Sequence, residues 1–306
     1  MSVYAAWNPI SEDRRGSASG GIATMLARQV LSEGGVYFGV RWSGEMKAVL
    51  DWTEDDVEPF RNSKYVQAQF SSQARSALET FLEAGRKVLF VGTPCQVASL
   101  RALRHYPNLI CVDLLCHGTV PPEYLEEEIA FLCKETPDRI TFRNGPLFRF
   151  SLWKGSSLLY SRDARHSHFL WAYLSGLSLR EACFRCPFAN LERSGDITLG
   201  DFIGIERHNA SFVWIHSKAG EELFQRSGAS WEERKLEERL SYRPGILECT
   251  KMPKERTVFE KALKGGKPFP KAVRKALRPY FMALPFKSLW NWCHHQAHLM
   301  KVKCQK

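Results

Sequence analysis

Short apolar runs alternate with amphipathic stretches along most of the chain. Residues 36–40, 87–91 and 109–115 are compact runs of β-branched, aliphatic and aromatic side chains, which is typical of buried strands. Residues 22–31 and 71–84 instead repeat apolar side chains at the spacing of one helix face, and this pattern predicts amphipathic helices. Strands and helices that alternate in this order predict parallel strands joined by right-handed crossovers.

The same alternation continues in shorter elements toward the end of the chain. The predicted fold class is therefore α/β, with a mixed, largely parallel sheet flanked by helices and a basic C-terminal extension. We expect Ser19 to cap the first helix, because serine is a favoured N-cap residue. Further strands are expected within residues 140–160 and at 197–202 and 212–215, and further helices at 97–103, 121–132 and 170–177.

The positive charge of the chain is concentrated at its end. The formal net charge is +10, but residues 251–306 alone hold 14 Lys or Arg and two acidic residues, a net charge of +12. This tail also contains several aromatic residues. Basic and aromatic residues together favour an interfacial helix on an anionic membrane surface. An acidic protein partner, or docking on the body of the chain, explains the pattern equally well. Nucleic acid is the competing partner for a basic patch and is not expected here.

The sequence pattern does not indicate a membrane-spanning protein. The first residues have no basic region followed by a long apolar stretch, as a signal peptide would. No apolar run approaches the ~20 residues needed to cross a bilayer. The expected location is the cytoplasm, with peripheral attachment to a membrane surface through the tail as an added option.

The chain contains nine cysteines, which we do not expect to form structural disulfides in a reducing compartment. Cys183 and Cys186 have the Cys-x-x-Cys spacing, which lets two thiolates face one metal from a single turn. Such a pair is half of a zinc site or half of a cluster site. A dithiol redox motif is the rival, although that motif is expected early in a βαβ unit.

Two further cysteines follow the predicted buried strands. Cys95 comes after residues 87–91, and Cys116 comes after residues 109–115. The carboxyl ends of parallel strands meet at one edge of a sheet, so both thiols should lie in one crevice. Cys95 should also lie at a helix N-terminus, where the dipole favours a thiolate. Cys111 is expected in the core, and no ligand role is assigned to Cys133, Cys249, Cys293 or Cys304.

Several polar residues are candidates for holding a ligand beside these cysteines. Small residues before a helix, here Ser17-Ala18-Ser19-Gly20-Gly21, offer backbone N–H groups to a phosphate, although a simple cap and turn explains them too. Lys64 and Gln67 would add a cation and an amide to the same ligand, with a solvated surface as the alternative. His117 is a candidate for proton transfer or for packing in its turn. Asp201 would bind a ring or ribose, or serve as an ordinary turn residue.

Taken together, a series of short stretches resembles the family of coenzyme F420 hydrogenase/dehydrogenase beta subunits. The stretches occur in the order of that family from about residue 4 to about residue 216, and it is the ordered set that makes the resemblance specific. They are Tyr4-Ala5-Ala6-Trp7, Ser17-Ala18-Ser19-Gly20-Gly21, Ser63-Lys64-Tyr65-Val66-Gln67, Gly92-Thr93-Pro94-Cys95-Gln96, Cys116-His117-Gly118, Phe142-Arg143-Asn144, Ser178-Leu179-Arg180, Cys183-x-x-Cys186 and Asp196-Ile197-Thr198-Leu199-Gly200-Asp201-Phe202.

The resemblance implies an α/β body that binds FAD and one 4Fe-4S cluster. It implies that residues 1–85 bind the flavin phosphates, that residues 86–250 bind the cluster within the same catalytic body, and that residues 251–306 are an added tail. The family's flavin-phosphate loop corresponds to Ser19, Gly20 and Gly21, and its Ser63-Lys64-Tyr65 segment lies near the flavin. The family's cluster ligands correspond to Cys95, Cys116, Cys183 and Cys186.

The expected function is that of a flavin- and iron–sulfur-dependent oxidoreductase. It would relay electrons between the cluster, FAD and a small-molecule redox substrate, with F420 as one candidate. No cysteine precedes Cys95, so we expect an external electron donor or acceptor such as a ferredoxin, or the substrate itself. The rival hypotheses are a zinc-stabilised binding module without enzymatic activity, and an electron-carrier subunit with no substrate of its own.

Overall fold

A computed structural model describes residues 2–103, 105–203, 209–242 and 248–283 of the chain. The chain divides into two compact units, Met1–Met252 and Pro253–Lys306, which are described separately below. Part of the basic and aromatic tail, including Leu284, Phe286, Leu289, Trp290 and Trp292, lies outside the described residues.

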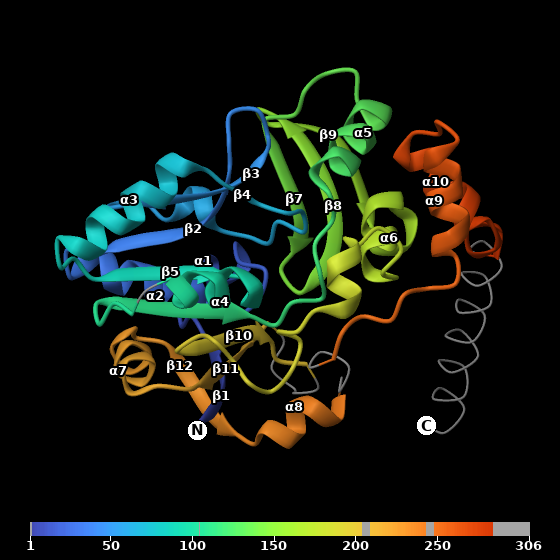
Figure 1. Cartoon of the computed structure of the whole chain (residues 1–306). Helices are drawn as coiled ribbons and strands as arrows, with labels where there is room; N and C mark the ends of the chain where they lie inside the picture. Colours follow the sequence, from blue (N-terminus) through green and yellow to red (C-terminus); the bar gives the residue numbers. More distant parts are fainter. Residues whose placement is uncertain (1, 104, 204–208, 243–247, 284–306) are drawn as a thin grey trace, which may run out of the picture. The chain divides into compact units, whose positions relative to one another are not determined.

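The first unit is built on a large mixed sheet (Figure 1). Its strand order is β12-β1-β11-β10-β6-β5-β2-β3-β4. The central strands β10, β6, β5 and β2 are parallel neighbours, whereas β12, β1 and β11 pair antiparallel at one side of the sheet. The strands are β1 (Val3–Trp7), β2 (Val36–Trp42), β3 (Ala48–Thr53), β4 (Gln69–Phe70), β5 (Val88–Gly92), β6 (Leu109–Leu114), β10 (Ile197–Asp201), β11 (Ser211–Ile215) and β12 (Ser230–Arg234).

Helices cover both faces of this sheet because its central strands are apolar on both sides. On β5, Leu89 and Val91 pack with α2 and α7, while Val88 and Phe90 pack with α3 and α4. The α/β fold with a mixed sheet flanked by helices, expected from the sequence, is therefore confirmed. The helices of this layer are α1 (Ser11–Arg15), α2 (Ile22–Ser32), α3 (Ser72–Glu83), α4 (Pro94–Leu103), α7 (Lys218–Arg226) and α8 (Leu236–Tyr242).

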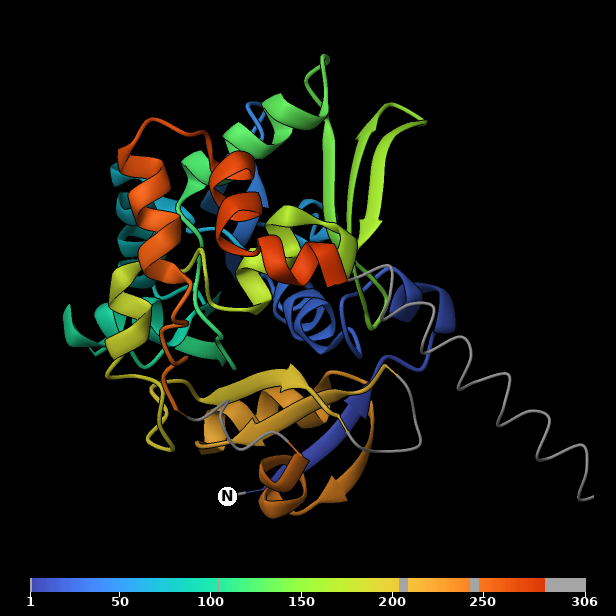
Figure 2. The same ribbon diagram turned by 90° about the vertical axis from the view of Figure 1, so that its right-hand side faces the viewer.

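A smaller antiparallel sheet forms the rest of the first unit. The sequence predicted short strands within residues 140–160, and the structure arranges them as a separate sheet of order β7-β8-β9. Figure 2 shows the hairpin of β8 and β9 apart from the strands of the large sheet. The elements here are β7 (Arg139–Asn144), β8 (Leu147–Lys154), β9 (Ser157–Asp163), α5 (Pro122–Leu132), α6 (His168–Leu174) and the 3₁₀ turn η2 (Ala164–His166). Two further 3₁₀ turns are η1 (Glu58–Phe60), which packs on β2 of the large sheet, and η3 (Glu181–Arg185).

The parallel strands bring several chain segments to one edge of the large sheet. Strand β5 leads into α4, and β6 leads into the turn at Cys116. Strand β10 is parallel to β6 and ends at Asp201. Helix α2 precedes β2, which is parallel to β5, so the N-terminus of α2 is expected at the same edge.

The second unit contains α9 (Arg256–Lys264) and α10 (Phe269–Ala276). The rings of Phe259 and Phe269 meet edge to face, with centroids 6.0 Å apart. Helix α10 begins at Phe269, with Pro270 in its first turn where proline is tolerated. The exposed basic side chains of this unit are Lys254, Lys261, Lys264, Lys267, Lys271, Arg274, Lys275 and Arg278.

Candidate functional site

A cavity of about 1510 Å³ opens at the carboxyl edge of the large sheet. Ligand pockets are usually about 300–1,000 Å³, so this cavity has room for a ligand larger than a drug-sized molecule. Three residues singled out from the sequence do not line it: Gly20, Cys183 and Cys186. Those that line it are Ser19, Gly21, Ser63, Lys64, Tyr65, Gln67, Cys95, Cys116, His117 and Asp201.

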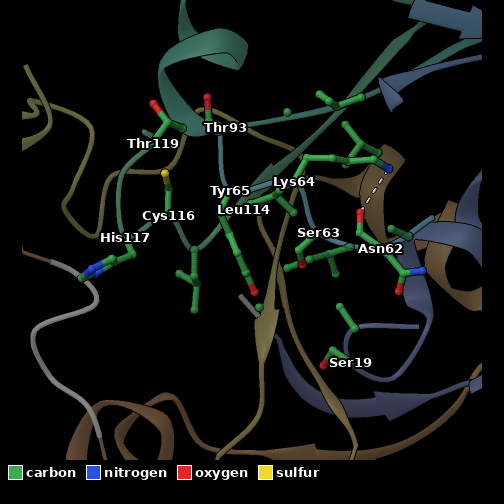
Figure 3. Close-up of a pocket in the computed structure, with 18 of the residues that line it drawn as sticks. Ser19, Asn62, Ser63, Lys64, Tyr65, Thr93, Leu114, Cys116, His117 and Thr119 are labelled. Atoms are coloured by element: carbon green, nitrogen blue, oxygen red, sulfur yellow. Dashed lines mark hydrogen bonds between the residues drawn. The ribbon is translucent and has the colours of Figure 1, made fainter. Parts of the chain in front are cut away.

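Different chain segments supply opposite sides of the cavity. Figure 3 shows Cys116 and His117 on one side and Ser63 and Lys64 on the other, with Tyr65 between them. The two sides are tied together by main-chain hydrogen bonds, because Val120, just after the cysteine turn, pairs with the segment around Val66. The cavity is therefore a single site built by the strand ends and by the loop that follows η1.

The first turn of α2 lies against the cavity wall, with Ile22 among the lining residues. The N-cap is Gly21, which has the left-handed φ of 85° that glycine adopts without strain. The prediction that Ser19 caps this helix is therefore wrong. The Ser19 hydroxyl donates instead to the carbonyl of Ala210 at 2.9 Å. Amides at a helix N-terminus favour an anion such as a phosphate.

Gly20 is held away from the cavity by close packing. Its amide donates to the hydroxyl of Ser211 at 3.0 Å, and its carbonyl accepts from the amide of Asn8. A Cβ at this position would lie 2.3 Å from the carbonyl oxygen of Ala6. Glycine is therefore required here for the approach of the loop to β1 and β11, and its amide is already used.

Lys64 folds back onto its own loop. Its ammonium donates to the carbonyls of Phe60, Arg61 and Asn62 at 2.9, 2.7 and 3.2 Å, and the last of these contacts is drawn in Figure 3. Burial lowers the pKa of Lys64 to about 7. The side chain lines the cavity but also organises the segment that leads to Tyr65.

Arg143, on β7, links Tyr65 and Asp201 across the cavity wall. Its guanidinium donates to Asp201 Oδ2 from two nitrogens, both at 3.1 Å, and to the Tyr65 hydroxyl at 3.3 Å. A further bond of 2.9 Å reaches the carbonyl of Ala18, beside the α2 turn. The Tyr65 ring stacks on Tyr173 with centroids 4.5 Å apart. This buried cation therefore fixes the aromatic wall of the cavity.

The sequence had indicated no role for Arg143, although it lies in one of the stretches that carry the family resemblance. A charged residue in a predicted strand, flanked by Phe142, was the available signal. Its pairing with Asp201, 58 residues away in the chain, was not visible from the sequence. Asp201, expected to contact a ligand or to serve as a turn residue, is bound by this cation.

The four candidate cysteines come from three segments that converge beside the cavity. Cys95 is exposed in the first turn of α4, with its Sγ 3.2 Å from the Thr93 hydroxyl. A Cβ on Gly118, in the turn after Cys116, would lie 3.2 Å from Cys183 Cβ. Cys183 therefore packs against the turn that follows β6.

Electrostatics support this convergence. Burial, with smaller contributions from the thiols of Cys183, Cys95 and Cys186, raises the pKa of Cys116 to about 12, although a hydrogen bond from the Gly118 backbone opposes the shift. Among the residues that the structure describes, no group of three or more His, Cys, Asp or Glu side chains is already arranged to hold a metal ion.

Each ring nitrogen of His117 lies within hydrogen-bond distance of a polar group. Nε2 donates to the carbonyl of Tyr173 at 3.1 Å, because a carbonyl can only accept. Nδ1 lies 3.2 Å from the hydroxyl of Thr250, which itself donates to the His117 carbonyl at 2.8 Å. A role in proton transfer would therefore require one of these contacts to break.

The segment around Thr250 was missed by the sequence reasoning. Glu248 and Thr250 line the cavity, and the thiol of Cys249 donates to the carbonyl of Cys186 at 3.1 Å. Cys249 had been given no role because it lies 63 residues from Cys186 and belongs to no ligand spacing. Cys111, by contrast, is fully buried in β6, as expected.

The carboxyl edge of the large sheet thus combines a helix N-terminus, an aromatic wall and several cysteines around one large cavity. These features are those of an α/β protein with a site large enough for a cofactor. The family profile for the C terminus of the coenzyme F420 hydrogenase/dehydrogenase beta subunit matches residues 85–239, about half of the chain. The chain belongs to this family, as the sequence motifs had indicated. No curated protein matches the chain.

The fold is also similar to that of a solved chain. The solved chain comes from the F420-reducing [NiFe] hydrogenase complex of Methanosarcina barkeri, in a study of xenon derivatization. The TM-score is 0.57 with 19% sequence identity, and the match covers 87% of the protein described here and 93% of the solved chain. At this identity the similarity shows a shared fold.

The helices of the described residues are all too short or too polar to cross a bilayer. Within those residues, none has the length and apolar character that a membrane span needs.

Proposed function

We propose that this chain is a redox protein that uses FAD and a 4Fe-4S cluster to oxidise or reduce a small-molecule substrate. The observation that carries the proposal is that one cavity is lined both by the first turn of α2 and by Cys95 and Cys116. Membership of the F420 hydrogenase/dehydrogenase beta subunit family supports the redox class. F420 is a candidate substrate, since the similar solved chain belongs to an F420-reducing complex.

In this proposal, Cys95, Cys116, Cys183 and Cys186 would hold the cluster. Four thiolates are the usual ligand set for 4Fe-4S clusters, and the convergence of these thiols from three segments fits that set. Without a metal, burial favours the protonated thiol at Cys116. Cluster binding is therefore expected to release protons.

The flavin would be held along the opposite part of the cavity. The amides of the α2 turn, at Gly21 and Ile22, suit the pyrophosphate, and Ser19 and Ser63 offer hydroxyl groups beside them. Tyr65, held by Arg143, supplies a rigid wall for a planar ring. When bound, a flavin joins the single-electron chemistry of a cluster to two-electron chemistry of a substrate.

The chain's own residues would orient the reactants and limit water. His117 can hold a proton at Nε2 beside the cysteine turn, and releasing Tyr173 would free that proton for a substrate. The exposed position of Cys95 suggests where an external redox partner such as a ferredoxin would exchange electrons. The similar solved chain belongs to a hydrogenase complex, which supports a partner protein here too.

The test is an anaerobic absorption spectrum of the full-length protein after reconstitution, with flavin, iron, sulfide and zinc measured on the same sample. The proposal predicts flavin bands, a broad thiolate–iron band and about four iron atoms per chain. The variant Cys116→Ser should lose the iron and keep the flavin. Cys133→Ser is the matched control, because Cys133 is also partly buried but has no part in the four-cysteine group.

A colourless protein that holds one zinc ion and no flavin would overturn the proposal in favour of a zinc-stabilised binding module. Iron loss in Cys133→Ser equal to that in Cys116→Ser would reject the assignment of the ligands. A protein that carries both cofactors and oxidises a partner, yet turns over no small molecule, would identify an electron-carrier subunit.

A further inference from the structure

A buried ion pair lies beneath the cysteine turn. Asp113 is on β6, three residues before Cys116, and Arg193 is in the loop between Cys186 and β10. Their side chains are 0% and 2% exposed, and Arg193 Nη2 donates to Asp113 Oδ1 at 2.8 Å. Burying two charges is expensive, and a buried pair often adds little net stability over an apolar one. The pair therefore calls for an explanation other than stability.

The remaining contacts of Arg193 join two segments that carry candidate ligands. The same guanidinium donates to the carbonyl of Leu114 at 3.1 Å, two residues before Cys116. It also donates to the carbonyls of Phe188 and Asn190 at 3.4 and 3.3 Å, in the loop just after Cys186. One rigid, planar group thus spans the end of β6 and the loop that leaves the Cys-x-x-Cys pair.

Asp113 completes the arrangement from the other side. It accepts from the amide of Gly195 at 3.1 Å and from the hydroxyl of Thr198 at 2.6 Å. Both donors lie where the loop joins β10. The loop 187–196 is therefore anchored at its start through Arg193 and at its end through Asp113.

We infer that Arg193 is a positioning residue that fixes the Cys183–Cys186 loop against the strand end leading to Cys116, so that thiols from separate segments act as one site. The inference rests on the proposed function for the identity of the natural occupant. It also predicts that metal binding by these thiols depends on Arg193. Mutation of residues that orient metal ligands typically lowers metal affinity by about 10–100-fold.

A second Arg–Asp pair on the same part of the sheet provides a matched control. Arg101, on α4, pairs with Asp196 just before β10, and Asp196 also accepts from the amide of Cys111 at 2.7 Å. This pair fixes the same two strands. Its hydrogen bond joins α4 to Asp196, the last loop residue before β10, whereas Arg193 holds the carbonyls of Phe188 and Asn190 just after Cys186.

The experiment uses anaerobic, reduced full-length protein and titrates it with Co²⁺, whose thiolate charge-transfer absorption reports both affinity and the number of sulfur ligands. Arg193→Met should weaken Co²⁺ binding at least about tenfold and lower the charge-transfer intensity. Arg193→Lys keeps the charge opposite Asp113 but cannot span three carbonyls, so it should lie between wild type and Arg193→Met. Arg101→Met should bind Co²⁺ like wild type.

Thermal unfolding and circular dichroism of each variant separate positioning from loss of fold. Both methionine variants are expected to unfold at lower temperature, but only Arg193→Met should lose the cobalt signal. If Arg193→Met does not fold, Arg193→Lys carries the test. Equal cobalt signals in Arg193→Met, Arg193→Lys and wild type would overturn the inference, as would equal losses in Arg101→Met and Arg193→Met.

The inference and the proposed function can fail separately. A wild-type protein that binds Co²⁺ through its thiolates, in a manner that depends on Arg193, but assembles no iron–sulfur cluster would sustain the inference and refute the proposed function. Cluster assembly in Arg193→Met equal to that in wild type would sustain the proposed function and refute the inference. A wild-type protein that binds no Co²⁺ would refute the inference.

Discussion

His216 makes the stability of the large sheet depend on pH. It follows β11 and lies 2.9 Å from the hydroxyl of Thr198 through Nε2. That hydroxyl donates its proton to Asp113 at 2.6 Å, so it accepts from a neutral imidazole that carries its proton on Nε2. Burial lowers the pKa of His216 from 6.5 to about 4.

The sign and size of the effect follow from these values. Between pH 4 and 6.5 the unfolded chain binds the proton that the folded chain excludes, so stability rises with pH across this window. This one group should therefore make the free energy of unfolding lower than its value above pH 7 by about 1.4 kcal/mol at pH 5.5 and by about 2.5 kcal/mol at pH 4.5. Below pH 4, the whole stabilisation that neutral His216 contributes, about 3 kcal/mol, is lost. These figures are upper limits, because His216 is only partly buried and solvent screens its charge.

The measurement is urea unfolding of wild type, His216→Gln and His105→Gln at pH 7.5, 5.5 and 4.5. His105 is exposed, so its variant should follow wild type at every pH. His216→Gln should be less stable at pH 7.5, because a buried bond is altered, but should lose less stability on acidification than wild type. Parallel pH profiles for wild type and His216→Gln would show that the imidazole is not kept neutral by the fold, and the reasoning would be refuted.

Other contacts predict equally definite results. Gly20→Ala should destabilise the protein by about 2 kcal/mol or more, because its Cβ would meet a carbonyl oxygen at 2.3 Å. Gly44→Ala, with open space around it, is the control, and equal melting temperatures would reject the packing argument. The hypothesis that the basic face of α10 binds an anionic membrane predicts a further result. Replacing Lys271, Arg274 and Lys275 with glutamate should then lower the affinity for phosphatidylserine vesicles about a hundredfold in a sedimentation assay, at about 1 kcal/mol for each lost cation. Unchanged sedimentation would exclude a membrane role for the α10 face.

The sequence predicts the centre of the fold well because its signals there are local. Strands β5 and β6 are short apolar runs separated by one helix, so their parallel pairing and the common edge of Cys95 and Cys116 could be inferred. The side of the sheet formed by β1, β11 and β12 could not. β1 is a five-residue apolar run whose partners follow about 200 residues later, and no local pattern indicates such a pairing.

The site was predicted by residue type better than by contact. Ten of the candidate residues line one cavity, because strand ends and helix starts determine where those positions lie. The direction of a long side chain is a different matter. Lys64 has a flexible stem that turns back to its own loop, and Arg143 pairs with a carboxylate from a distant strand. Both results depend on packing that forms only when the whole chain is folded.

The place of β1 in the sheet has a consequence for how the protein is made. This first strand lies between β11 and β12, and the loop that follows it is locked by Ser211 through Gly20. A chain that leaves the ribosome from its N-terminus must therefore keep Val3–Trp7 unpaired until residues 211–234 have been synthesised. The start of α2 gains its final support only then. A prematurely terminated chain lacks both partners of β1 and should therefore be a target for proteolysis.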